Sequence, residues 1–257
     1  MGAGSVNDAS PDTPKAPARP GFTERTPLPK RFYKEARAAA TEDGRFRIEL
    51  DGRPVRTPGR NLVAVASQPL AAALAVEWQA QVEVIDPMTM PMTRLANSAI
   101  DGVAPAMEEV GAEIVRYAGS DLLCYRVDTP AQLVALHAEL WDPLLAWARE
   151  RFGATFMLSE GVVHVAQPPR TLEALAAALP DDPLRLAALN LMTTLSGSAL
   201  LAFAVAHGRL SPEEAWRAAH ADEEVQEQLW GTDAEAQERR AKRFRDFEAA
   251  SRAYALI

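Results

Sequence analysis

The sequence predicts an α+β fold, with a small, mainly antiparallel sheet in the N-terminal part and a mostly helical bundle after it. Alternation of apolar and charged residues, the pattern of a half-buried strand, occurs early, over residues 45–50. From residue 172 onward no strand pattern appears, and helical spacing with capping residues replaces it. Strands followed by helices are typical of a segregated α+β protein rather than of a doubly wound parallel sheet.

The composition is that of a globular protein. The chain has 257 residues, of which 48% are hydrophobic and 24% are charged. Its 27 Lys and Arg against 35 Asp and Glu give a net charge of −8, the wrong sign for a general nucleic-acid binder. A single cysteine, Cys124, excludes an internal disulfide and fits a reducing compartment.

Three segments are expected along the chain. Residues 1–30 hold six prolines and few large apolar side chains, so they predict a disordered tail. They carry no apolar core of a secretory signal and no acid-poor presequence, which makes the cytosol the expected compartment. Residues 31–100 predict a β-rich N-terminal domain with one or two helices. Residues 101–257 predict a mainly helical domain with a small β-hairpin near 154–166.

The N-terminal elements follow from turn and cap residues. Asp51-Gly52 suits a two-residue hairpin turn between a strand at 46–50 and a returning strand at 53–57, with a third at 62–66. Ser67 can cap a helix whose inward stripe runs to residue 81. Prolines predict an extended segment over residues 85–92, after which Thr93 can cap a short helix that ends near residues 101–102.

The later elements are predicted by apolar periodicity. We expect a helix over 107–119, a strand over 122–127, a helix from Pro130 that restarts at Asp142-Pro143, and a hairpin of 155–158 with 162–166. Four helices follow, over 172–179, 184–207, 212–229 and 234–254, with capping boxes at 211–214 and 232–235. The uncharged stretch 186–206 is long enough to span a membrane, but its polar middle predicts a buried central helix.

Motifs for catalysis, metals or nucleotides are absent. The four histidines are far apart in sequence, and neither a phosphate-binding loop nor a dinucleotide fingerprint occurs. Ser196-Gly197-Ser198 falls within the predicted buried helix, and Cys124 falls in an apolar strand, so both are better explained as core residues. No enzyme emerges from the residues.

Two features suit a binding surface, and each has a structural alternative. Met88, Met90 and Met92 adapt to irregular apolar partners, or they form a core strand. The acidic run that holds Asp222, Glu223, Glu224 and Glu227 stands before Trp230, where arginines of a partner would dock, or it is a solvated helix face.

Nine short strings, in order, resemble the family of F1-ATPase assembly chaperones that handle the alpha subunit, the mitochondrial F1 complex assembly factor 2 family. They are RFYK at 31–34, LDGRPVRTP at 50–58, EW at 77–78, MPMTRLAN at 90–97, ID at 100–101, RYAG at 116–119, DLLCYR at 121–126, WDP at 141–143 and LWG at 229–231. The resemblance implies a chaperone without catalytic activity or cofactor. It would bind the unassembled F1 alpha subunit, shield the surface that later meets the beta subunit, and be displaced by beta. The arginine-rich and alanine-rich composition suggests a bacterial homologue that acts in the cytoplasm, whereas eukaryotic relatives act in the mitochondrial matrix.

The resemblance also implies a set of partner-binding residues. Glu77 and Trp78 match a characteristic helix position, although Trp78 on an inward stripe also suits a core anchor. The family strings also include Arg94, Asn97 and Asp101, which share one face of a short helix. These three residues suit either a buried polar network or a contact surface. The acidic run matches the helix at the client surface. The full set is Glu77, Trp78, Arg94, Asn97, Asp101, Asp222, Glu223, Glu224, Glu227 and Trp230. The alternative is a small-molecule enzyme with its acid and base among Glu77, Asp101 and His164.

Overall fold

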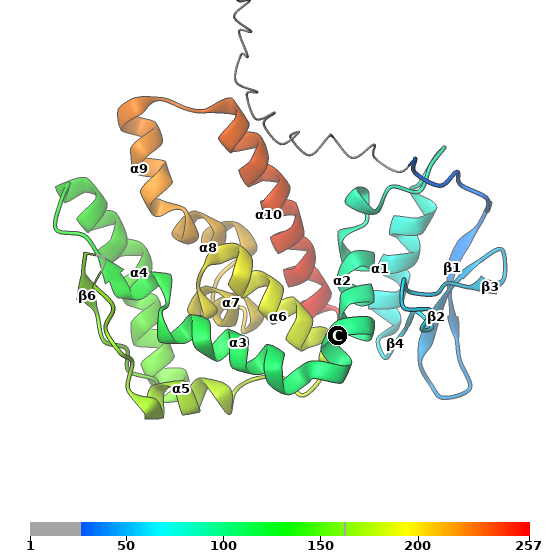
Figure 1. The fold of residues 1–257 in the computed structure, drawn as a ribbon, viewed down its shortest axis with the longest axis horizontal. Helices are drawn as coiled ribbons and strands as arrows, with labels where there is room; N and C mark the ends of the chain where they lie inside the picture. The colour runs from blue at the N-terminus through cyan, green and yellow to red at the C-terminus, as the bar shows by residue number, and fades with distance from the viewer. Residues whose placement is uncertain (1–26, 162) are drawn as a thin grey trace, which may run out of the picture.

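The computed structural model describes residues 27–161 and 163–257. Figure 1 shows a small sheet with two helices at one end of the molecule and a helical part at the other. Most of the predicted tail therefore lies outside the described residues. Residues 29 and 30 are already paired with the chain, because Pro29 O accepts a hydrogen bond from Ile85 N at 2.8 Å and Lys30 forms a β-bridge with Val84.

The sheet has four short strands, and every pair in it is antiparallel. Strand β1 (Ala36–Ala40) pairs with β2 (Phe46–Leu50), which also pairs with β3 (Arg53–Pro54) and with β4 (Ala64–Val65). Asp51 and Gly52 form the β2–β3 turn with φ angles of 49° and 79°, which confirms the predicted turn. The Asp51 carboxylate accepts hydrogen bonds from the backbone N–H groups of Lys34 and Glu35, so it also positions the entry to β1.

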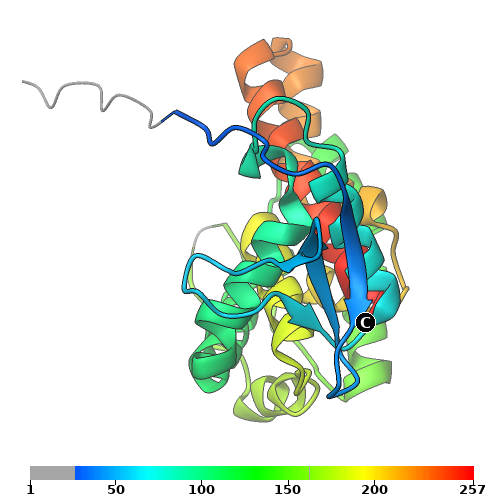
Figure 2. The ribbon, with the colours of Figure 1, turned by 90° about the vertical axis from the view of Figure 1, so that its right-hand side faces the viewer.

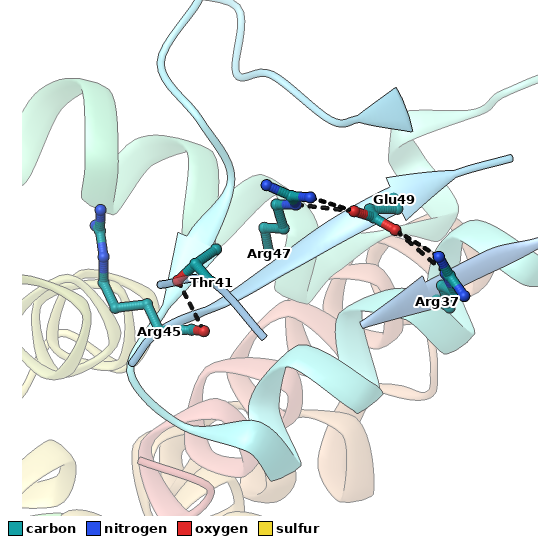
Figure 3. Close-up of polar contacts among 5 residues, drawn as sticks. All are labelled: Arg37, Thr41, Arg45, Arg47 and Glu49. Atoms are coloured by element: carbon teal, nitrogen blue, oxygen red, sulfur yellow. Dashed lines mark hydrogen bonds and ion pairs between the residues drawn. The ribbon is translucent and has the colours of Figure 1, made fainter. Parts of the chain in front are cut away.

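Glu49 is a buried carboxylate on the outer face of β2, shown in Figure 3. Its two oxygens lie 3.0 Å from Arg37 Nη2 of β1 and 2.7 Å from Arg47 Nη2. These guanidinium groups lower the pKa of Glu49, the hydrogen bond from Arg47 having the largest effect. Thr41 Oγ1 donates to Arg45 O at 2.9 Å and closes the β1–β2 turn. On this face of the sheet, Glu49 is therefore covered by the side chains of Arg37 and Arg47.

Helix α1 (Gln68–Gln79) contacts β1, β2 and β4. Ser67 caps it as predicted, since the Ser67 hydroxyl accepts a hydrogen bond from Leu70 N. Ile48 of β2 and Leu70 and Leu74 of α1 are fully buried. Figure 2 views the molecule from the end that carries the sheet, with the strands in front and helices behind them.

The segment after α1 differs from the prediction. Residues Pro87–Thr89 form a 3-10 turn capped by Asp86, and α2 (Pro91–Ser98) begins two residues before Thr93. Residues 85–92 are therefore not continuously extended. A π-helical turn (Ala99–Val103), a 3-10 turn (Ala104–Ala106) and α3 (Met107–Gly119) follow directly, so no linker interrupts the chain near residue 100. One cluster of buried apolar residues includes both parts, and the domain boundary stays a prediction.

Residues 122–166 also form different elements from those expected. Residues Leu122–Cys124 make a 3-10 turn, and β5 (Tyr125–Arg126) pairs in parallel with β6 (Ser159–Glu160). Strand β6 is the only strand found among the described residues near 154–166, so the hairpin expected there is not seen in that part of the chain. Between the two strands, α4 (Ala131–Phe152) runs continuously through Pro143 and ends at Gly153, which has a φ of 71°.

Six helices complete the fold. Two of the predicted helices are each divided in two. Gly197, with a φ of 73°, ends one helix and the Ser198 hydroxyl caps the next, while His220 separates a second pair. The capping box at Ser211 is confirmed. The helices are α5 (Pro169–Ala176), α6 (Pro183–Ser196), α7 (Ala199–Ala206), α8 (Pro212–Ala219), α9 (Ala221–Trp230) and α10 (Ala234–Ala255).

Helix α7 is the centre of the helical part. Each of its residues from Ala199 to Val205 is buried, and it contacts α3, α4, α6, α8 and α10. An α-helix that is apolar on all sides is expected where neighbours surround it. None of the helices among the described residues combines the length and the hydropathy needed to cross a bilayer.

Candidate functional site: helix α9 and its surroundings

Helix α9 carries the acidic run and packs through Ala221 and Val225, which are buried. Figure 1 shows it at the outer end of the helical part, next to α4 and joined to the start of α10. The high proportion of polar residues on its other faces follows from this position, because only one stripe of the helix meets apolar neighbours.

Three of the four carboxylates in the acidic run are bound within the protein. Asp222 Oδ1 lies 2.6 Å from Nε2 of the buried His137 on α4. Glu224 pairs with Arg217 of α8 at 3.0 Å, and Glu227 pairs with Arg240 of α10. These contacts fasten α9 to three helices, so much of the predicted acidic cluster supports the fold.

Glu223 is the exception in this run. It is exposed and makes no salt bridge among the residues that the structure describes. Glu223, Glu227 and Trp230 are four and three residues apart, so they lie along one face of α9. We call these three residues the α9 face.

The end of α9 exposes two large apolar side chains. Trp230 is 85% exposed and Leu229 is 57% exposed. A tryptophan exposed to this extent forgoes the favourable burial of a large apolar surface within its own chain. Gly231, with a φ of 87°, ends the helix directly after Trp230. The α9 face therefore combines a free carboxylate with an uncovered aromatic ring.

Glu77 contacts the chain's own backbone. Its carboxylate accepts hydrogen bonds from Met92 N at 2.9 Å, from Thr93 N at 2.7 Å and from Thr93 Oγ1 at 2.7 Å. It therefore caps the N-terminus of α2 from a neighbouring helix, where a negative charge also meets the positive end of the helix dipole.

Trp78 packs against Tyr33, with ring centroids 6.0 Å apart in an edge-on arrangement. Tyr33 Oη donates a hydrogen bond to Trp78 O at 2.7 Å. The half-buried Trp78 is packed against the core cluster. These contacts support the core-anchor interpretation of Trp78.

Arg94, Asn97 and Asp101 do not form one network. Arg94 Nη2 lies 2.5 Å from Asp246 Oδ1 of α10, which joins α2 to the last helix. Asp101 accepts hydrogen bonds from Thr57 Oγ1 at 2.6 Å, from Gly59 N at 2.7 Å and from Asn61 Nδ2 at 2.9 Å. These donors, Thr57 first, lower the pKa of Asp101. Asn97 Oδ1 is buried and has no hydrogen-bond partner in the described part of the chain.

The three residues of the enzyme alternative are not brought together. Glu77 caps α2 and Asp101 holds the loop at 57–61, whereas His164 contacts Tyr125 of β5. Strand β5 pairs with β6, which Figure 1 shows at the end of the helical part away from the sheet. Burial raises the pKa of the Cys124 thiol to about 12. No group of three metal-ligating side chains occurs within the described ranges.

A groove between α1, α2 and α10 is a second candidate surface, which no pattern in the sequence predicted. Its volume is about 1290 Å³, and Val76 of α1, Met88 and Arg245 of α10 are among its lining residues. Met88 is exposed, whereas Met90 and Met92 are buried. The three methionines therefore do not share one environment, because two belong to the core and one lines the groove. The prediction of one extended segment did not anticipate this difference.

Comparisons with known proteins agree with one another. The ATP12 chaperone protein family matches residues 30–149. A candidate chaperone of Agrobacterium tumefaciens has 48% sequence identity and a TM-score of 0.87, covering 90% of this chain and 87% of that one. Atp12 of Paracoccus denitrificans has 41% identity and a TM-score of 0.83, covering 89% and 98%. The mitochondrial protein atp12 of Schizosaccharomyces pombe is 26% identical over 230 residues, covering 83% of this chain and 79% of that protein. The chain therefore belongs to the ATP12 chaperone family.

Proposed function

We propose that this protein binds the unassembled alpha subunit of F1 ATP synthase in the bacterial cytoplasm and shields its beta-facing surface until the beta subunit displaces it. Membership of the ATP12 chaperone family supports a role in ATP synthase assembly. The alpha subunit as client follows from the sequence resemblance, and the chemistry of the α9 face supports it.

The observation that carries the proposal is Trp230, which is 85% exposed at the end of α9 and lies two helical turns from the exposed carboxylate of Glu223. Tryptophan is enriched among the residues that dominate binding energy at protein interfaces. An exposed carboxylate suits an arginine of the partner, because guanidinium and carboxylate groups form paired hydrogen bonds. Glu223 supplies such a carboxylate without first breaking an internal salt bridge, whereas Glu224 and Glu227 would have to release Arg217 and Arg240.

Holding and release need no chemical step on this scheme. A chaperone that binds only the unassembled client lowers the free concentration of that client when the free chaperone concentration exceeds the Kd of the complex. The beta subunit removes the chaperone if its affinity for the same surface of alpha is greater. The proposed scheme requires no residue that acts as an acid, a base or a nucleophile.

The test is to mix the purified protein with unassembled F1 alpha subunit and to measure the mass of any complex by light scattering after size exclusion. We expect a defined complex that dissociates as beta subunit is added. Failure to form a complex at micromolar concentrations would contradict the proposal.

Charge reversal locates the surface. Glu223→Lys should weaken alpha binding without changing the melting temperature, and Trp230→Ala should do the same. The matched control is Glu173→Lys, because Glu173 is an exposed helical glutamate on α5, away from α9. Normal affinity in Glu223→Lys and in Trp230→Ala, both folded, would remove the α9 face from the client surface.

A further inference from the structure

Helix α9 has little apolar surface with which to hold its own orientation. Its buried residues are Ala221 and Val225, both in its first half, and it contacts α4 and α8. A helix of ten residues is marginal in water without tertiary contacts. An alanine and a valine bury less surface than the leucines and aromatic rings that anchor larger helices. The direction in which α9 points therefore depends on its polar contacts.

The contact between Asp222 and His137 differs from the other two carboxylate contacts of α9. The side chains of Arg217 and Arg240 in those contacts are 49% and 24% exposed, whereas that of His137 is 2% exposed. Exposed salt bridges contribute little, because two long side chains must be held in one geometry. His137 Nε2 lies 2.6 Å from Asp222 Oδ1. This contact therefore ties the first turn of α9 to a group inside the protein.

The ring of His137 is held in place by its neighbours on α4 and α8. It stacks on Trp141, one turn further along α4, with ring centroids 3.6 Å apart and ring planes 20° apart. Trp141 is buried, and its Nε1 donates a hydrogen bond to Ala218 O of α8 at 2.9 Å. The imidazole is therefore held in one position, to which the Asp222 carboxylate is bound.

The surroundings of His137 also determine which ring nitrogen donates. His137 Nδ1 is buried and has no hydrogen-bond partner in the part of the chain that the structure describes. An N–H at that position would be a buried donor without an acceptor, which is unfavourable. The hydrogen therefore belongs on Nε2, and His137 donates it to the Asp222 carboxylate. A glutamine side chain can place an amide N–H in a similar position, whereas leucine has no donor.

A small rotation of α9 at Asp222 moves its other end by a large distance. Trp230 is eight residues beyond Asp222, which corresponds to about 12 Å of helix at ~1.5 Å per residue. A tilt of about 10° at the start of α9 would displace the end that carries Trp230 by about 2 Å. A gap of about 1 Å already removes much of the attraction between packed atoms. The affinity of the α9 face therefore depends on how α9 is held at Asp222.

We infer that His137 is a positioning residue for the client surface, because from its buried site on α4 it fixes, through Asp222, the orientation of the α9 face. The inference rests on the proposed function, since it takes the α9 face as the surface that meets the client. His137 itself does not touch the client. It raises affinity by holding α9 in one orientation before the client binds, which lowers the ordering cost of association.

The test compares two variants of His137 in the full-length protein. His137→Leu removes the donor at similar side-chain volume, and Asp222 stays hydrated because its side chain is 45% exposed. We expect His137→Leu to raise the Kd for the unassembled F1 alpha subunit by at least about ten-fold. His137→Gln keeps a donor and should recover most of this loss. Melting temperatures show that both variants are folded.

The matched control is Ile48→Val, which trims a fully buried side chain of β2, at the opposite end of the molecule from α9 (Figure 1). It should lower the melting temperature slightly and leave the Kd unchanged. A double-mutant cycle adds a second check. In the Trp230→Ala background, His137→Leu should raise the Kd by less than about two-fold, because the side chain that it positions is gone. An unchanged Kd in folded His137→Leu, equal losses in His137→Leu and His137→Gln, or additive effects in the cycle would overturn the inference.

Amide hydrogen exchange of the free protein tests the positioning without the client. Exchange over residues 221–230 should be about five-fold faster in His137→Leu than in the wild type and close to the wild-type rate in His137→Gln, while exchange in α2 stays unchanged. If the wild type binds no alpha subunit and exchange shows this pattern, the proposed function fails and the positioning of α9 by His137 stands. If the wild type binds the alpha subunit and exchange in α9 is equal in all three proteins, the inference fails and the proposed function stands.

Discussion

Removal of the Glu77 carboxylate should destabilise the fold rather than weaken client binding directly. In Glu77→Ala, Met92 N and Thr93 N lose their acceptor at the start of α2. Each unsatisfied donor costs about 1 kcal/mol at a half-buried site that water can partly reach. Loss of the favourable charge at the helix N-terminus adds about 0.5 kcal/mol, and loss of the hydrogen bond from Thr93 Oγ1 adds a similar amount. The expected decrease in the free energy of unfolding is therefore about 3 kcal/mol.

Urea denaturation followed by circular dichroism measures this change. Glu77→Gln keeps one acceptor oxygen and should lose roughly half as much, about 1.5 kcal/mol. The control is Glu83→Ala, which removes an exposed carboxylate from the loop after α1 and should cost less than about 0.5 kcal/mol. A loss below about 1 kcal/mol in Glu77→Ala, with an unchanged denaturant slope, would refute the capping role. Client binding by the folded fraction of Glu77→Gln should be normal.

Two further changes test other contacts. Gly59→Ala should lower the free energy of unfolding by about 1 to 3 kcal/mol, because an added Cβ would lie 2.8 Å from the Asp101 carboxylate; a neutral result in thermal denaturation would show that the loop moves freely. Burial raises the pKa of Asp121 to about 6, above the value in the unfolded chain. Protonation of Asp121 therefore stabilises the folded state. This stabilisation is complete below the unfolded pKa and is lost as pH rises through 6. The wild type should therefore gain about 1 kcal/mol relative to Asp121→Asn between pH 7 and pH 5; a constant difference in urea titrations at the two pH values would contradict the raised pKa.

Local signals predicted the start and end of several elements. Asp51-Gly52 adopts positive φ angles in the β2–β3 turn, and Ser67 caps α1. The Ser211 capping box has both of its reciprocal hydrogen bonds. Such signals act within three or four residues, and so the sequence alone carries them.

Some elements differ from the prediction although a local signal for the difference is present in the sequence. Gly197 followed by Ser198 is a helix end followed by a helix cap, and the chain does break there. The apolar content of residues 186–206 predicts burial but does not require one continuous helix. In contrast, nothing near β5 or β6 in sequence specifies their parallel pairing, because the two strands are separated by the whole of α4.

The acidic run shows why the candidate site needed the tertiary structure. Its composition indicates a cluster of four carboxylates, but the partners of three lie on α4, α8 and α10. These three contacts join residues that are 7, 13 and 85 positions apart, so they depend on how the helices pack, which periodicity does not encode. Only the fold distinguishes Glu223, which remains free in the described part of the chain, from its bound neighbours.

By itself, the sequence determined the α+β class, the turn at Asp51-Gly52, the caps at Ser67 and Ser211 and the family resemblance, since these rest on residue type and short spacing. The caps predicted at Thr93 and in the box at 232–235 were wrong, because α2 begins at Pro91 and Asp233 caps α10. Only the tertiary structure decided that Glu77 caps α2, that Asp101 holds a loop, that Trp230 stays exposed and that a groove separates α1 from α10. The physical reason is the distance along the sequence over which each kind of interaction acts. Backbone preferences act between neighbours in sequence, whereas burial and charge pairing are set by helices that meet after the chain has folded.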